Sequence, residues 1–265
     1  MATLVSFHAH PDDESITAAG LIHRAASQGH RVVLVFGTRG ELGEVQDGFL
    51  DEGEPLWQRR VAETLASAEV LGAARTEFLG YVDSGMMGEP TNDNPNSFWQ
   101  APVEDAAQRL AELLREESAD VLTVYDDNGG YGHPDHIQVH RVGLRAAEIA
   151  GTPRVYQLTS NREHMVRGFE QFKEQAAAAG IELPGDAGPP DGLGKPESEI
   201  TAVFDVSDLM EVKRASMRVH ASQIAEHSFF LTMPDEAFRY AFGTEWAIRA
   251  GQGPGVTETD PMAGL

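Results

Sequence analysis

The sequence predicts an α/β fold, a Rossmann-like, doubly wound and mostly parallel sheet with helices on both faces. Two observations support this fold class. Short apolar and β-branched runs alternate with longer segments of helical periodicity. Gly29 and Gly72 follow two of these segments, as expected where a left-handed residue ends a helix. The alternation is typical of strand–helix–strand units with right-handed crossovers.

The amino-terminal half starts this alternation at once. Leu4–His8 is a short apolar run, and the helical spacing of Ile16, Ala19 and Ile22 predicts a helix directly after it. In order, the expected elements are a strand at 4–8, a helix at 14–28, a strand at 31–36, a helix at 55–71 and a strand at 75–79.

The carboxyl-terminal half continues the pattern. A helix at 103–117 precedes an apolar strand at 120–125. Pro134 suits the first turn of the next helix, expected over 134–149, because the missing N–H of proline is tolerated there. Further strands are expected at 155–158 and 202–204.

Two stretches rich in Gly, Pro and Asn, at 83–100 and 183–198, are expected to be loops. Long loops in a compact domain are commonly lids or binding loops, so the predicted fold has extended active-site loops. We expect a single domain over residues 1–250 and a disordered tail over 251–265.

The composition limits the class of protein. The chain has 265 residues with 20 basic and 42 acidic side chains, a net charge of −22, which opposes binding to nucleic acid or to an anionic membrane. It contains no cysteine, so a metal would be held by His, Asp and Glu. The start at Met1 lacks the basic and apolar regions of a signal peptide, and we expect a cytoplasmic protein. Homo-oligomerisation is left open.

The first of two prolyl motifs, Ala9–Glu14 (AHPDDE), follows the first predicted strand. His10 and Asp13 are three residues apart at a strand-to-helix turn, where their side chains can converge on one point. Asp12 between them points elsewhere and can accept a proton from water beside a metal. The alternative is that one aspartate only caps the helix that follows.

The second motif, Tyr131–His136 (YGHPDH), follows a later strand. His133 and His136 are three residues apart, and Asp135 between them can orient an imidazole. His140 lies one further turn along the helix, so spacing alone leaves open which two histidines matter. Because ligands bind beyond the carboxyl ends of parallel strands, we expect both motifs to form one site. Three protein ligands and an open fourth position are typical of catalytic zinc.

Together the two motifs resemble the paired signature of the PIG-L/LmbE-like zinc-dependent N-deacetylases, and the likeness extends over most of the chain. The zinc ligands that this resemblance implies are His10, Asp13 and His136. It also implies that Asp12 is the general base, that His133 is the acid that stabilises or protonates the departing group, and that His140 is not a ligand.

Four further segments resemble the mycothiol branch of that family, which includes a deacetylase of N-acetylglucosaminyl-inositol and an amidase of mycothiol conjugates. These segments are Thr38–Glu41, Arg60–Glu63, Asp83–Met86 and His220–Gln223. By this likeness Arg60 and Asp83 would hold sugar or inositol hydroxyls, and Tyr131 would assist at the carbonyl oxygen. The alternatives are a solvated helix residue for Arg60, a turn former for Asp83 and a satisfied core histidine for His220.

The function implied is that of a zinc-dependent hydrolase that removes the acetyl group from an N-acetylated amino sugar or its conjugate, such as N-acetylglucosaminyl-inositol. An amidase that cleaves mycothiol-type thiol conjugates would use the same metal chemistry. A third reading, from another class, is a non-catalytic binding protein that contains zinc. Iron(II) or cobalt could occupy the same ligands.

Overall fold

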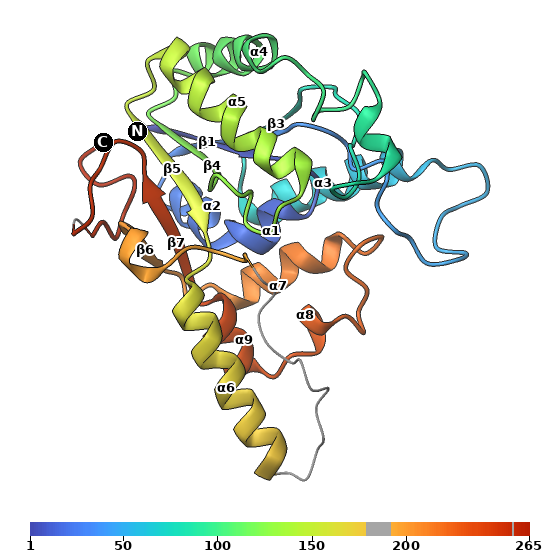
Figure 1. Ribbon diagram of the computed structural model, residues 1–265, viewed down its shortest axis with the longest axis vertical. Coiled ribbons are helices and arrows are strands. Elements are labelled where there is room, and N and C mark those ends of the chain that lie inside the picture. The colour runs from blue at the N-terminus through green and yellow to red at the C-terminus, as the bar shows by residue number, and fades with distance from the viewer. Residues whose placement is uncertain (179–191, 256) are drawn as a thin grey trace.

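The computed structural model describes residues 1–178, 192–255 and 257–265, and these contain a seven-stranded sheet (Figure 1). The strand order is β3-β2-β1-β4-β5-β7-β6. The strands are β1 (Thr3–His8), β2 (Arg31–Phe36), β3 (Arg75–Phe78), β4 (Val121–Tyr125), β5 (Arg154–Thr159), β6 (Ala202–Asp205) and β7 (Thr244–Arg249). Strands β1 to β5 pair in parallel, whereas β7 pairs antiparallel with both β5 and β6. The predicted mostly parallel α/β fold is confirmed.

Helices cover both faces of this sheet (Figure 1). Helices α4 and α5 pack against each other on one face, while α7 packs with α1, α2 and α3 on the other. Their bounds are α1 (Asp13–Thr17), α2 (Ala19–Ser27), α3 (Leu56–Leu71), α4 (Val103–Glu116), α5 (Pro134–Ala150), α6 (Arg162–Ala178), α7 (Met210–Val219), α8 (Phe229–Thr232) and α9 (Asp235–Phe242). Strands β1 and β4 are buried at every residue, which explains their continuous apolar runs.

The expected helix at 14–28 is two helices, because the chain breaks at Ala18 (φ −139°). Helix α2 begins anew after the break, and its first free amides, at Gly20 and Leu21, donate to the Glu245 carboxylate at 3.0 and 2.8 Å. That partner is more than 220 residues away in sequence. Local periodicity therefore predicts the helical residues but not the break.

Several elements of the carboxyl-terminal third were not predicted from the sequence: β7 and helices α6 to α9. In β7 a charged residue, Glu245, is buried at 4% exposure directly before the apolar residues of the strand. Its cation, Lys213, comes from α7. A strand that buries a paired charge does not show the alternation by which strands are usually identified.

The two predicted loops differ in how much of each the structure describes. Residues 83–100 are irregular except for a short 3₁₀ turn at Pro90–Asp93. Of the expected loop at 183–198, residues 183–191 lie outside the described part of the chain.

The carboxyl-terminal stretch, expected to be disordered, makes specific contacts. Glu258 pairs with the edge of the sheet, because its amide donates to the Thr201 carbonyl at 2.8 Å and its carbonyl accepts from the Val203 amide at 2.7 Å. Met262 is buried. The prediction of disorder rested on the position of this stretch at the chain terminus, whereas its contacts are made to strand residues that precede it by more than 50 positions. The extent of the domain, 1–250, stays a prediction.

Among the residues described, no helix has the length and apolar character needed to cross a membrane.

Candidate metal centre and active site

The two prolyl motifs meet at one edge of the sheet. Strands β1 and β4 are parallel neighbours, with Leu4 opposite Val121 and Ser6 opposite Thr123. Each motif follows the carboxyl end of its strand, so the pairing brings together segments that are about 120 residues apart in sequence. This is the edge at which α/β sheets bind ligands.

Three imidazoles form the centre of the site. The ring centroid of His10 lies 4.6 Å from that of His133 and 5.4 Å from that of His136, and the last two rings are 5.2 Å apart. All three side chains are buried. Burial and the neighbouring imidazoles lower the pKa of His133 to about 4, and burial lowers that of His136 to about 4 against the attraction of Asp13. Both rings are therefore neutral at pH 7.

Asp13 joins the imidazoles. Its Oδ2 lies 3.6 Å from His10 Nδ1 and its Oδ1 lies 3.4 Å from His136 Nε2. Burial alone would raise the pKa of this carboxyl, but His136 and His10 outweigh burial and hold it below the ordinary value of 3.8. An ionised carboxylate between two imidazoles is a suitable donor set for zinc.

The orientation of His10 is set by carboxylates behind it. Its Nε2 lies 3.1 Å from Asp135 Oδ2 and 3.5 Å from Asp83 Oδ1, which leaves Nδ1 on the side of Asp13. Ser84 in turn holds Asp135, through its amide at 2.9 Å and through its hydroxyl. A ligating histidine commonly donates its second nitrogen to a carboxylate in this way. The prediction that Asp135 orients an imidazole thus applies to His10.

His133 differs from His136 in its available nitrogen. Its Nδ1 accepts the Asp135 amide at 3.1 Å, so the neutral ring has its proton on Nε2. That nitrogen is a donor and offers no free lone pair to a metal. His140 Nδ1 lies 3.0 Å from the Tyr125 carbonyl, and His140 is not part of the candidate ligand groups found in the described residues.

Two overlapping ligand groups are present, His10 with His133 and His136, and His10 with Asp83 and Asp135. In the second group the carboxylate oxygens already accept protein amides: Gly85 and Leu42 donate to Asp83, and Ser84 donates to Asp135. Asp13 belongs to neither group: its Oδ2 accepts the His10 amide at 2.8 Å, and its Oδ1 faces His136 Nε2.

Asp12 lies beside this set on a backbone with φ +93°. Its side chain is 18% exposed, and Arg60 Nη2 lies 3.4 Å from its Oδ2. Burial raises the pKa of Asp12 to about 6, against the opposing effect of the Arg60 cation. A carboxylate that is open to solvent and titrates near neutral pH is suited to accept a proton from water.

Tyr131 is an aromatic residue at the solvent-exposed side of the site, and it is 48% exposed. Its hydroxyl lies 3.5 Å from His136 Nε2, and the two rings meet edge to face at 4.9 Å. Burial of its hydroxyl and the charge of Asp13 raise its pKa, so it stays protonated and can donate a hydrogen bond.

Arg60 contacts Asp12, and Asp83 contacts His10, so both residues lie at the candidate metal centre and not in a separate pocket for a polyol. Arg60 is 3% exposed, and its guanidinium donates to the carbonyls of Gly40, at 2.9 Å, and of Pro11. Asp83 lies against His10, whose imidazole outweighs the effect of burial and lowers the Asp83 pKa. Arg60 is therefore not the solvated helix residue of the alternative reading. Asp83 does form a turn, because its Oδ1 accepts the Gly85 amide at 2.9 Å, and it also contacts His10.

Sequence analysis missed three residues that support the site. Ser84 fixes Asp135, and the ring of Tyr125 stacks on His136 at 4.6 Å with an interplanar angle of 23°. Glu14, fully buried, accepts the Asp12 amide at 3.0 Å. The position of Ser84 beside Asp83 and of Glu14 within the first motif were the available signals.

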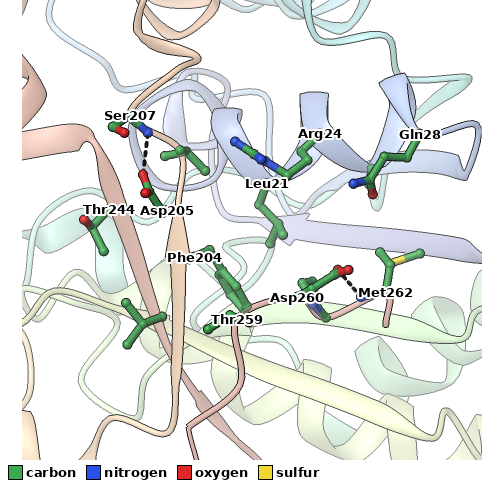
Figure 2. A pocket seen from close by; sticks show the side chains of 14 residues that line it. Leu21, Arg24, Gln28, Phe204, Asp205, Ser207, Thr244, Thr259, Asp260 and Met262 are labelled. Carbon is green, nitrogen blue, oxygen red and sulfur yellow. Dashed lines mark hydrogen bonds between the residues drawn. The ribbon is translucent and has the colours of Figure 1, made fainter. Parts of the chain in front are cut away.

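A hollow of about 610 Å³ lies elsewhere (Figure 2). Leu21 and Arg24 of α2, Phe204 and Asp205 of β6, and Asp260 and Met262 of the carboxyl-terminal stretch line it. Its lining contains neither a histidine nor a residue of the two motifs, so its size does not make it the candidate site.

Comparisons with known proteins show what the chain is similar to. Residues 5–147 match the family model described as PIG-L: GlcNAc-PI de-N-acetylase. Two proteins named 1D-myo-inositol 2-acetamido-2-deoxy-alpha-D-glucopyranoside deacetylase are similar to the whole chain. That of Streptomyces griseus is 40% identical over 99% of this chain and 88% of its own length, and that of Acidothermus cellulolyticus is 37% identical over 99% and 95%.

Among solved structures, the N,N'-diacetylchitobiose deacetylase from Pyrococcus horikoshii aligns with a TM-score of 0.53 and 24% identity, over 89% of this chain and 73% of that one. At this identity the likeness supports the fold alone.

Proposed function

The chain belongs to the PIG-L family of GlcNAc-PI de-N-acetylases, and on this premise we propose that it is a zinc-dependent hydrolase of an N-acetylated amino sugar conjugate of the N-acetylglucosaminyl-inositol type. One observation supports the proposal most: His10, Asp13 and His136 converge at the ligand-binding edge of the sheet with Asp12 beside them. These three residues would hold the zinc ion. Zinc, when bound, polarises an amide carbonyl and acidifies water.

The remaining residues would each have a separate part in the reaction. Asp12, partly exposed and ionised above about pH 6, accepts the proton of the attacking water. His133 Nε2 donates toward the departing nitrogen, because its Nδ1 is already occupied by the Asp135 amide. The Tyr131 hydroxyl donates toward the carbonyl oxygen as negative charge develops there.

The proposed substrate follows from the relatives, which are named for an acetamido-glucopyranoside linked to myo-inositol. Such a substrate is uncharged and rich in hydroxyls, so the net charge of −22 does not repel it. Asp83, at the start of the loop beside His10, is the proposed acceptor for a sugar hydroxyl. Arg60 is proposed to act at the same end of the site, through the Asp12 turn that it contacts.

The test has two arms. In the first, a panel of N-acyl glucosamine derivatives, including the inositol-linked compound and a thiol conjugate of it, is assayed for released amine. We expect the inositol-linked acetamide to be the preferred substrate. Faster cleavage of the thiol conjugate would assign the amidase reaction instead, and no release from any compound would support a binding protein.

The second arm separates metal binding from chemistry by comparing two adjacent aspartates. Asp13→Ala should lose zinc, measured by metal analysis of the purified protein. Asp12→Ala should retain zinc near the parent level while its turnover falls by about 10²–10⁴-fold. Equal loss of zinc from both variants would contradict the assigned roles.

A further inference from the structure

The backbone of Asp12 is in an unusual conformation. Its φ of +93° and ψ of −27° lie in the left-handed region, and apart from Ser118 it is the one residue other than glycine with positive φ in the described part of the chain. This region is sparsely populated by residues with a side chain, and it persists where the surrounding structure holds it. The contacts of the Asp12 turn should therefore determine where its carboxylate points.

The principal holder of this turn is Glu14. Its Oε2 accepts the Asp12 amide at 3.0 Å. Its Oε1 accepts the Ser67 and Ser15 hydroxyls at 2.5 and 3.0 Å and is 2.6 Å from His220 Nε2. Glu14, Ser67 and His220 are all fully buried, so water does not compete for these bonds.

His220 is the most distant member of this network, 206 residues from Glu14. It caps the carboxyl end of α7, and its Nδ1 is buried with no hydrogen-bond partner among the described residues. Among the described residues, the bond to Glu14 is therefore the hydrogen bond through which the His220 side chain acts.

The same segment contains a natural control. Ser222, two residues after His220, donates its amide and hydroxyl to Glu63 of α3, at 2.9 and 2.6 Å. It is also buried, and it makes the same kind of bond to a carboxylate. Its partner is not Glu14, so it anchors the segment without contacting the Asp12 turn.

We propose that His220 and Glu14 are positioning residues for Asp12: the His220–Glu14 bond fixes the carboxylate that accepts the Asp12 amide, and so holds the left-handed turn that aims Asp12 at the reacting water. The catalytic role of Asp12 in this inference rests on the proposed function. The claim that Glu14 and His220 hold the turn does not depend on it. Neither residue touches substrate. Their effect on turnover passes through Asp12 alone.

The kinetic test is a double-mutant cycle. His220→Ala removes a hydrogen bond to a charged group, and kcat should fall by about 10- to 100-fold with zinc content and KM unchanged. His220→Gln keeps an N–H donor and should recover much of kcat, whereas Ser222→Ala should stay near the parent. In an Asp12→Ala background, His220→Ala should cause no further loss. A loss of the same size in both backgrounds would overturn the proposal.

A second readout does not need activity. In metal-free protein, amide hydrogen exchange over residues 10–16 should be faster in His220→Ala than in the parent and unchanged in Ser222→Ala. Unchanged exchange in His220→Ala would overturn the claim that His220 holds the turn. If the parent hydrolyses no N-acetyl amino sugar, the proposed function fails while this measurement still decides the structural claim. If His220→Ala does not fold, Ser67→Ala removes another donor from the same Glu14 oxygen and is expected to give the same pattern.

Discussion

Two buried clusters of charge differ in how completely the protein pairs them. Between β7 and α7, Lys213 donates to Glu245 at 2.7 Å, and Glu245 also accepts the first amides of α2. The two side chains are 1% and 3% exposed, and each has its partners within the protein. This cluster joins a strand and two helices.

In the cluster at the ends of β1 and β4, the carboxylates are not matched by an equal number of cations. Four carboxylates gather there, those of Asp12, Asp13, Asp83 and Asp135, and the imidazoles of His133 and His136 stay neutral. Positive charge comes from Arg60 beside Asp12 and from His10, whose pKa is raised because Asp83 and Asp135 outweigh the effect of burial. The carboxylates still outnumber these cations, and an excess of carboxylate oxygens beside imidazoles is the donor chemistry of a cation site. The difference shows that burial of charge alone does not mark a functional site, whereas the balance of donors and acceptors does.

The largest expected effect is on stability, from breaking the balanced cluster. Lys213→Met leaves Glu245 buried without its cation and should lower the free energy of unfolding by about 3–5 kcal/mol, measured by urea denaturation. Zinc content and turnover per folded molecule should stay at the parent level. The double variant Lys213→Met/Glu245→Gln should recover part of the loss, because it removes the unpaired charge. A loss of zinc from the folded single variant would show that the two clusters are coupled.

A smaller effect, on zinc affinity, is expected from changing Asp135, which orients His10 in the unbalanced cluster. Asp135→Asn weakens the acceptor behind His10 and should reduce zinc affinity by about 10- to 100-fold, measured by competition with a chelator. Asp120→Asn is the matched control, because Asp120 accepts the Thr3 amide at the opposite end of β1. If Asp135→Asn bound no zinc at all, Asp135 would itself be a ligand.

The third prediction concerns pH. Burial raises the pKa of Asp12 in the metal-free protein to about 6, above its ordinary value of 3.8. Because the folded-state pKa is the higher one, the folded state binds more protons between these values, and this carboxyl lowers stability as pH rises through that window. NMR titration of labelled aspartate should show one carboxyl titrating near pH 6 that is absent in Asp12→Asn. Adding zinc should lower its pKa, because a nearby cation favours the carboxylate.

The smallest effect is expected at the proposed hydroxyl acceptor. Asp83→Asn should lower kcat/KM on the inositol-linked substrate more than on a small N-acyl substrate without hydroxyls. Because Asp83 lies 3.5 Å from His10, zinc affinity must be measured in parallel. Equal losses on both substrates would assign Asp83 to the metal centre, and the unbalanced cluster would then include no residue for the sugar.

How far sequence alone reaches differs between these clusters. The candidate metal donors lie in two short motifs after buried strands, so residue type and position at strand ends were enough to predict that His10 and His136 lie at one site. The sequence predicted that Asp135 orients an imidazole, but not that this imidazole belongs to His10. The Lys213–Glu245 pair was not predictable, because its members lie on an unpredicted strand and helix and become neighbours only after the sheet reverses direction at β7.

Glu258 covers part of the edge of the sheet at β6. Strand β6 is the last in the order, and the pairing of Glu258 with Thr201 and Val203 occupies backbone groups that an edge strand would otherwise present to solvent. An unpaired strand edge is a template on which another chain can add a strand. The carboxyl-terminal stretch thus covers these backbone groups, and we expect a chain cut before Thr257 to leave them open to pairing with another strand.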